Sequence, residues 1–245
     1  MQITALYRHP IKSHGRESLD HVTLIEGQSM PFDRRWAVAH EAAKVEEAEW
    51  VACANFSRGS KAPLLMAVNA TLDEASGQIT LTHPDRPTIT VHPTRDEKAL
   101  IDWVMPLVPQ NRALPAKVVE LPSRGYTDSP YASLSLCNTA SHAAVETLAQ
   151  TPLSPLRWRG NIWFDGVPAW EEFGWVDRDV RLGAAVLRIK EPIVRCLATT
   201  ANPETGERDV DTLRTLNILG HQNFGIYAEV ITGGAVAVGD SLEIL

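Results

Sequence analysis

The sequence predicts a mainly β protein of the α+β class, with antiparallel, barrel-like sheets and a few covering helices. Three observations support this prediction. Strand-like segments are spread evenly along the 245 residues, helix-like segments are few, and the clearest strands alternate apolar with polar residues. Such alternation is typical of half-buried antiparallel strands, and the helices are too few for a doubly wound sheet.

The expected strands are rich in β-branched and aromatic residues and are separated by turn residues such as glycine, proline and aspartate. In chain order they cover residues 3–11, 34–40, 64–73, 77–83, 88–93, 116–121, 159–166, 179–189, 225–231 and 235–245. Gly233 and Gly234 lie between the last two strands, so the sequence predicts a hairpin turn there.

Three further segments have a helical pattern, and they cover residues 96–108, 139–150 and 209–219. In the first, five apolar residues fall on one face, and Pro106 ends or distorts the last turn. The second is rich in alanine and follows Asn138, a residue type that caps helices. The third starts at candidate aspartate caps and ends at Gly220.

The chain is long enough for two modest domains. The first helical segment and the proline-containing stretch that runs to Pro122 form a plausible seam between two halves. We therefore expect an N-terminal β-rich domain over residues 1–118 and a second β-rich domain over residues 119–245, which pack as one unit.

The composition disfavours several classes of function. Hydrophobic residues make up 44% of the chain and charged residues 22%, a balance typical of soluble globular proteins. The net charge of −7 disfavours nucleic acid as a partner. The longest apolar run, near APLLMAV, is too short to span a bilayer, and the N-terminus lacks the pattern of a signal peptide. We therefore expect a cytoplasmic protein that binds neither membrane nor nucleic acid.

The common catalytic motifs are missing from the sequence. The histidines are not paired at metal-binding spacing, and neither a serine-hydrolase elbow nor a glycine-rich nucleotide loop is present. The three cysteines are Cys53, Cys137 and Cys196, and they form no C-x-x-C pair. A disulfide framework or a structural zinc site is therefore not expected.

Cys196 is the strongest single candidate for chemistry. It follows an expected strand and opens a loop, in the stretch VRCLATTANPETGERD. Loops on rigid scaffolds carry function more often than strand interiors do, and the neighbouring cation Arg195 would favour the thiolate form. The residues alone leave two interpretations open, which are a small buried hydrophobe near a turn and a thiolate that binds something.

Five motifs in a fixed order carry a resemblance to a known family. They are HPIKSHG at 9–15, DRRWAV at 33–38, RWRGNIWFDG at 157–166, VRCLATTANPETGERD at 194–209 and NFGIYAEVITGGAVAVGDSLEIL at 223–245. Together they resemble the MOSC domain proteins, named for the C-terminal domain of molybdenum cofactor sulfurase, with the N-terminal β-barrel domain of that family in front. The resemblance implies that its closest functional relatives are the mitochondrial amidoxime-reducing component and its bacterial counterparts.

The resemblance implies a cofactor and a set of residues. Cys196 would be the protein ligand to molybdenum, which the cofactor carries on a pterin dithiolene, and a soft thiolate suits such a metal. The anionic groups of the cofactor would need cations and hydroxyls around them. The matching cofactor-binding positions are Lys12, Ser13, Arg34, Ser129, Arg159, Asn161 and Tyr227.

The resemblance also implies a reaction. We expect a molybdenum-dependent oxidoreductase that reduces small N-hydroxylated or N-oxide compounds with electrons from a separate ferredoxin- or flavoprotein-like donor. Two alternatives remain open, which are a sulfur carrier with a persulfide on Cys196 and a cofactor carrier without turnover. The segment 41–65 departs from the family pattern, and we expect Arg58 and Pro63 to stand in there for an arginine and a proline at a different spacing. His14 stands where close relatives often have cysteine.

Overall fold

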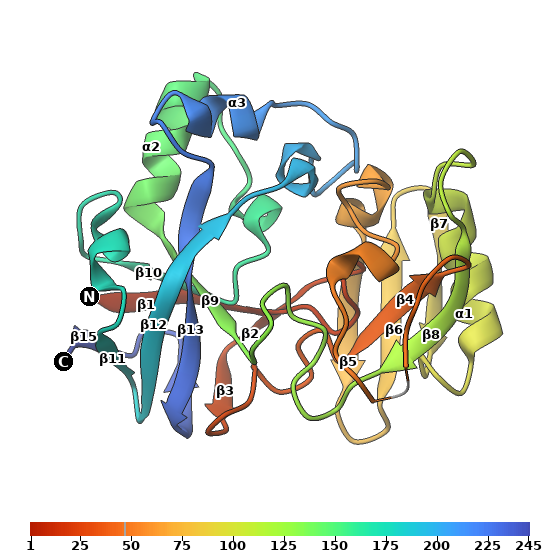
Figure 1. Ribbon diagram of the computed structural model, residues 1–245, viewed down its shortest axis with the longest axis horizontal. Coiled ribbons are helices and arrows are strands. Elements are labelled where there is room, and N and C mark those ends of the chain that lie inside the picture. Colours follow the sequence, from red (N-terminus) through yellow and green to blue (C-terminus); the bar gives the residue numbers. More distant parts are fainter. Residues whose placement is uncertain (47) are drawn as a thin grey trace.

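The computed structural model describes residues 1–46 and 48–245, and it consists of two bodies packed side by side (Figure 1). The larger body contains both ends of the chain and an eight-stranded sheet. The smaller body contains a three-stranded sheet, a two-stranded sheet and one α-helix. The predicted fold class is therefore confirmed, since strands dominate and the helices are few.

The large sheet is mainly antiparallel and has the strand order β15-β11-β12-β13-β9-β10-β1-β2. Its strands are β1 Gln2–Arg8, β2 Glu17–Leu19, β9 Leu134–Asn138, β10 Ile162–Asp165, β11 Asp179–Leu182, β12 Ala185–Val194, β13 Asn223–Thr232 and β15 Leu242–Ile244. The pair β9–β10 is parallel, and the other neighbours are antiparallel. The sheet encloses a core of fully buried aliphatic side chains that includes Leu136, Leu187 and Ile226.

The smaller body is built on two sheets and has its own core. Its elements are β4 Trp36–His40, β5 Asn69–Asp73, β6 Gln78–His83, β7 Arg86–Val91, β8 Pro115–Glu120 and α1 Glu97–Val104. Strands β5, β6 and β7 form a meander, and β4 pairs with β8. Helix α1 contributes Leu100, Trp103 and Val104 to the core, as the predicted apolar face requires. Pro106 lies in the 3₁₀ turn Met105–Leu107 that ends this helix, as predicted.

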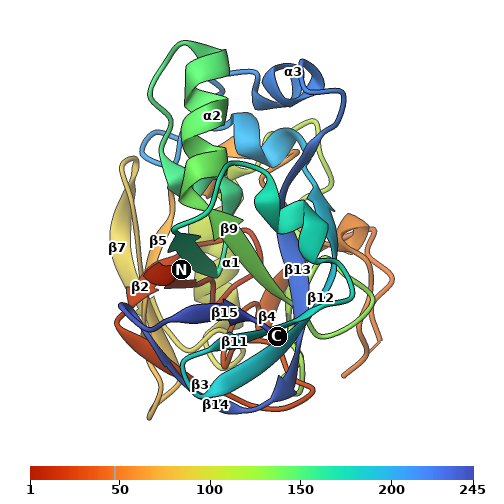
Figure 2. The same cartoon turned by 90° about the vertical axis from the view of Figure 1, so that its left-hand side faces the viewer.

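Two helices lie at one end of the large sheet, where Figure 2 shows α2 upright with α3 beside it. Helix α2 covers Thr139–Ala149, and the side chain of Asn138 caps it by accepting from the amide of Ala140. Helix α3 covers Thr212–Asn217 and is shorter than predicted. The reason is that Asp211 is its cap, whereas Asp209 pairs with Arg157 instead.

The remaining helical turns are of the 3₁₀ type and are short. They are η1 Cys53–Asn55, η2 Pro63–Ala67, η3 Met105–Leu107, η4 Pro155–Trp158, η5 Glu171–Trp175 and η6 Leu197–Thr200. In Figure 1 the orange turns of the smaller body face the light-blue turn of the larger one. The turns η1, η4 and η6 carry or adjoin residues of the site described below.

The predicted hairpin at Gly233 and Gly234 was wrong. The strand that follows, β14 Gly234–Ala237, pairs with β3 His21–Leu24 rather than with β13. Gly233 packs against this N-terminal strand, since a Cβ built on it would lie 2.7 Å from the carbonyl oxygen of Leu24. The pairing partner therefore comes from the other end of the chain, which a local turn pattern does not reveal.

The N-terminal strands contribute to the larger body. Strand β1 pairs with β10, and β2 pairs with β1, so both belong to the large sheet. The first 24 residues thus link the two halves of the sequence in one structure.

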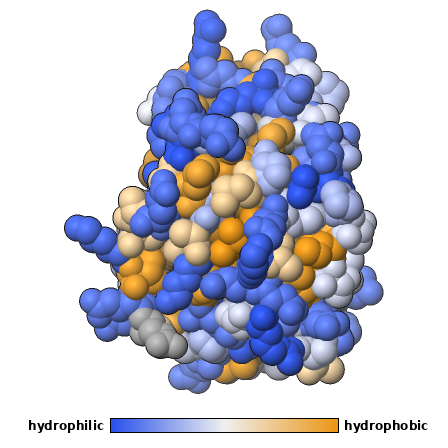
Figure 3. Space-filling view, turned by 90° about the vertical axis from the view of Figure 1, so that its right-hand side faces the viewer, coloured by the Kyte–Doolittle hydropathy of each residue, from blue (hydrophilic) through white to orange (hydrophobic). Residues whose placement is uncertain are grey.

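Figure 3 shows the opposite end of the molecule, where apolar side chains gather near the middle of the face and polar ones surround them. In the described part of the chain, no helix has the length and apolar character needed to cross a membrane.

Candidate functional site

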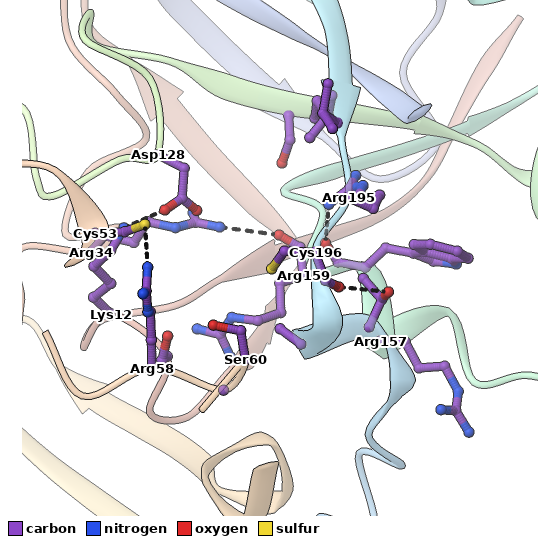
Figure 4. Close-up of a pocket in the computed structure, with 18 of the residues that line it drawn as sticks. Lys12, Arg34, Cys53, Arg58, Ser60, Asp128, Arg157, Arg159, Arg195 and Cys196 are labelled. Atoms are coloured by element: carbon purple, nitrogen blue, oxygen red, sulfur yellow. Dashed lines mark hydrogen bonds and ion pairs between the residues drawn. The ribbon is translucent and has the colours of Figure 1, made fainter. Parts of the chain in front are cut away.

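A cavity of about 240 Å³ opens where the two halves of the sequence meet. Six of the residues selected from the sequence line it, and they are Cys196, Lys12, Ser13, Arg34, Arg159 and Tyr227. Figure 4 shows side chains from both halves pointing into this space. One wall comes from residues before 61 and the other from residues after 127.

The other two selected residues lie beside the cavity and are used internally. The side-chain oxygen of Asn161 accepts from the amide and the hydroxyl of Ser135 at 3.1 and 2.9 Å. Its amide nitrogen donates to the carbonyl of Tyr7, so Asn161 ties β9 and β10 to β1. Ser129 donates to the carbonyl of Tyr131 at 2.7 Å. In the structure these two side chains shape the cavity from behind, and direct contact with a cofactor stays a prediction for them.

The loop after β12 fixes the backbone of Cys196 and leaves its thiol free. The carbonyl of Cys196 accepts from the amide and the hydroxyl of Thr199, both at 3.1 Å. The same hydroxyl contacts that of Thr212 at 2.7 Å, which joins the loop to α3. Cys196 is exposed and lines the cavity, and Figure 4 draws its sulfur on the cavity side. The interpretation of Cys196 as a buried hydrophobe was therefore wrong.

Arg195 holds the loop in place rather than facing the neighbouring thiol. Its guanidinium donates to the carbonyls of Phe224 at 2.8 Å and Trp158 at 2.7 Å. It also lies over both of these aromatic rings, which stack on each other with centroids 3.9 Å apart. From the sequence, Arg195 was expected to act as a cation beside the thiol. In the structure its hydrogen bonds join β13 and η4 to the end of β12.

Positive charge dominates the cavity. Six cations line it, namely Lys12, Arg34, Arg58, Arg157, Arg159 and Arg195, and Asp128 is the one carboxylate among the described lining residues. Three of the cations are paired with carboxylates: Lys12 with Asp128 at 2.6 Å, Arg34 with Asp33, and Arg157 with Asp209 at 2.6 Å. The other three have no carboxylate partner in the part of the chain that the structure describes. The cavity is therefore suited to an anion, although the whole chain is acidic.

The charges in the cavity perturb one another. Burial, together with the neighbouring Arg34 and Arg16, lowers the pKa of Arg159 to about 9. Because a guanidinium stays protonated in proteins, this shift reflects the free-energy cost of an uncompensated buried cation. Burial would raise the pKa of Asp128, but Lys12 and Arg34 hold it at about 2. Burial raises the pKa of Tyr227, and Asp128 adds to the effect, so its hydroxyl remains a donor.

Several donors at the cavity have no partner. The Nη2 atom of Arg159 and the Nε and Nη1 atoms of Arg157 are buried and make no hydrogen bond among the described atoms. Arg157 is only 3% exposed. A buried donor without an acceptor costs about 1–3 kcal/mol. Figure 4 draws the Arg157 guanidinium pointing away from the cavity, so it is the Arg159 nitrogen that is preorganised for the oxygens of a phosphate-like group, which is the anion the predicted cofactor carries.

The backbone of the cavity is strained at three positions. Ser13, Arg34 and Arg159 have φ angles of 62°, 52° and 49°, in the left-handed region that favours glycine. Such a conformation costs roughly 1–2 kcal/mol for each residue with a side chain. The amide of Arg34 donates to the carbonyl of His9 at 2.7 Å, which holds this turn. The surrounding fold therefore holds these three residues in a backbone conformation that costs free energy locally. Such strained residues are often found at binding sites.

Sequence reasoning did not select Asp128 or Cys53, which line the cavity, and it assigned no role to Arg58. Asp128 lies in the stretch TDSPY, from which only its neighbour Ser129 was selected. Cys53 and Arg58 lie in the segment 41–65, of which the structure describes every residue except 47. The Nη1 atom of Arg58 donates to the sulfur of Cys53 at 3.1 Å. The sequence offered one signal for this part of the cavity. Arg58, after η1, stands in for an arginine of the family pattern, but at a different spacing.

Comparisons with known families agree with the motifs. The sequence model of the MOSC N-terminal beta barrel domain matches residues 1–105, and that of the MOSC domain matches residues 124–243. No curated protein matches the chain.

Among solved structures, the YUAD protein from Bacillus subtilis is 15% identical, with a TM-score of 0.48, and the match covers 100% of this chain and 96% of that one. YiiM from Geobacillus stearothermophilus is 14% identical, with a TM-score of 0.35, over 46% of this chain and 53% of that one. YiiM from Escherichia coli is 16% identical, with a TM-score of 0.33, over 46% and 62%.

Proposed function

Since the chain belongs to the MOSC domain proteins, a family associated with molybdenum cofactor, we propose that its cavity binds this cofactor and that Cys196 is the protein ligand to the metal. The observation that supports this most directly is the combination of an exposed thiol with unpartnered cationic donors in one cavity. A thiolate suits a soft metal centre, and guanidinium groups suit phosphate oxygens.

The residues of the cavity fit the chemistry of the group. The unpartnered nitrogen of Arg159 offers a hydrogen bond to a phosphate, and Lys12 and Arg34 add positive charge nearby. In the described part of the chain, no cluster of three or more His, Cys, Asp or Glu could hold a metal ion. Cys196 would be the protein ligand to a metal that the dithiolene of the cofactor carries.

The reaction we propose is the reduction of small N-hydroxylated or N-oxide compounds in the cytoplasm, with electrons from a separate ferredoxin- or flavoprotein-like protein. The bound molybdenum would supply oxygen-atom transfer. The chain itself binds the anionic part of the cofactor, holds Cys196 through the Thr199 hydrogen bonds, and presents apolar surface at Val194, which lines the cavity. The hydroxyl of Tyr227, which burial keeps protonated by raising its pKa, is a donor for a polar substrate.

One alternative uses the same thiol in a different chemistry. Because Cys196 is exposed, it could carry a persulfide and pass its outer sulfur to an acceptor. A sulfur carrier has no need of unpartnered arginine nitrogens around the thiol, which favours the cofactor proposal. A cofactor carrier without turnover would use the same cavity and differ only in showing no reduction.

The experiment that tests the proposal is metal analysis of protein from a host that makes molybdenum cofactor. We expect near-stoichiometric molybdenum in the wild type, strongly reduced molybdenum in Cys196→Ala, and unchanged molybdenum in the matched control Cys137→Ala, whose cysteine does not line the cavity. No molybdenum in the wild type would contradict the proposal, and intact mass would then show whether Cys196 carries a persulfide. Molybdenum without reduction by any electron donor would indicate a carrier.

A further inference from the structure

We infer that Arg58 selects substrates that carry a carboxylate or a similar anionic group next to an apolar body. This inference rests on the proposed function, since it names the substrate class of the same site. It starts from the charges of the cavity, because Arg58, Arg159 and Arg195 have no carboxylate partner among the described residues. Arg195 is occupied by two carbonyls, and Arg159 offers its free nitrogen beside the other basic residues.

Arg58 differs from the other cations in where it comes from. It lies on the loop after η1, in the wall that faces the Cys196 loop (Figure 4). Its side chain is half-buried, and its guanidinium donates to the sulfur of Cys53. A thiol is a weak acceptor, so an incoming carboxylate would be a better partner for this guanidinium.

The loop that carries Arg58 is held rigidly next to the Cys196 loop. The amide of Ser57 donates to the carbonyl of Val38 at 2.8 Å, and Arg208 donates to the carbonyl of Ser60 at 2.9 Å. Gly59 lies beside the Cys196 loop, since an added Cβ would lie in van der Waals contact, 3.5 Å, with the Cβ of Ala198, two residues after Cys196. Because these contacts position the loop and the Cys53 contact orients the guanidinium, Arg58 is preorganised to bind an anion.

The surface near the thiol supplies the apolar part of the substrate class. Val194, which lines the cavity, is 72% exposed, and Leu197, next to Cys196, is 48% exposed. Exposed aliphatic side chains beside a cavity favour a ligand with an apolar body. Arg58 on the facing wall would then bind the anionic end of that ligand. The unpartnered nitrogen of Arg159 remains available for the cofactor.

The experiment compares two probes that differ only in one carboxylate, benzamidoxime and 4-carboxybenzamidoxime. Steady-state kinetics and molybdenum content are measured for the wild type, Arg58→Gln and Arg58→Lys. Arg112→Gln is the matched control, because Arg112 is exposed and does not line the cavity. We expect Arg58→Gln to raise KM for the carboxylate probe about 10- to 100-fold, as for loss of a charge-assisted hydrogen bond. Arg58→Lys should recover part of the loss, and benzamidoxime should be unaffected.

Two kinetic or metal-content results would overturn the inference, and a binding measurement provides a third test. If Arg58→Gln weakens both probes equally, the residue does not recognise the carboxylate. If it loses molybdenum, Arg58 belongs to the cofactor site instead. Calorimetric binding of benzamide and 4-carboxybenzamide needs no turnover, so it separates this inference from the proposed function. If the protein reduces neither probe but still binds 4-carboxybenzamide in a way that depends on Arg58, that result would contradict the reductase proposal and support the inference. Absence of such binding in the wild type would refute it.

Discussion

Replacing Gly225 by alanine should destabilise the protein far more than an ordinary glycine substitution. Gly225 has a φ angle of 71° and lies on β13, opposite a register shift in β12 between Pro192 and Val194. A Cβ built on it would lie 2.7 Å from the carbonyl oxygen of Leu136. It would also lie 3.3 Å from the Nη2 atom of Arg195, the residue that holds the Cys196 loop.

The size of the effect follows from two additive terms. The left-handed backbone costs alanine roughly 1–2 kcal/mol, of which the lower entropy of the unfolded chain offsets about half. Crowding against the backbone and side chains around Gly225 adds about 1–3 kcal/mol. The free energy of unfolding should thus fall by about 2–4 kcal/mol. For a chain of this length, each kcal/mol lowers Tm by about 2–4 °C.

Gly220→Ala is the matched control for this prediction. Gly220 also has a positive φ of 80°, but no atom lies within 4 Å of the position of its Cβ. It should therefore show only the conformational term, about 1 kcal/mol. Urea denaturation and thermal melts of both variants measure the difference. Equal losses of stability for Gly225→Ala and Gly220→Ala would refute the steric argument.

Three further predictions concern the cavity. Sulfate at ten times its dissociation constant should stabilise cofactor-free protein by about 1.4 kcal/mol, and Arg159→Gln should abolish most of the rise in Tm. Burial would raise the pKa of Asp128, but Lys12 and Arg34 hold it at about 2, below its unfolded value of 3.8. The carboxylate therefore contributes to the free energy of unfolding above pH 3.8, and this contribution is lost as the pH falls toward 2. Acid titration of Asp128→Asn should therefore show a shallower loss of stability than the wild type, and an unchanged slope would contradict the assignment. Trp158→Ala, which removes a side chain that is 1% exposed, should cost about 3–5 kcal/mol in urea denaturation, whereas a loss below 1 kcal/mol would refute its role in the core.

Local patterns predicted much of the secondary structure. The alternation in QITLTH predicts β6, and Asn138 before an alanine-rich run predicts the start of α2. Strand β9 was missed because it is only five residues long and runs directly into α2. The hairpin at Gly233 was wrong because pairing with β3 depends on contacts more than 200 residues apart in sequence.

The site was predictable only where motifs and chemistry coincide. Cys196 and Arg159 lie in two of the motifs, and the structure brings both to one cavity. Asp128 and Arg58 reach the same cavity from segments about 70 residues apart, and no local pattern indicates where their side chains point. The direction of Arg195, toward two backbone carbonyls, likewise follows from packing around β13 rather than from its place beside the cysteine.

The measurement that tests the central claim most directly is X-ray absorption at the molybdenum edge of the wild type and of Cys196→Ser. The account predicts that the metal is bound through the thiolate of Cys196. The spectrum of the serine variant should therefore lack one molybdenum–sulfur contribution and gain a shorter one from oxygen. Identical sulfur coordination in both proteins, at equal molybdenum content, would contradict the claim that Cys196 is the ligand.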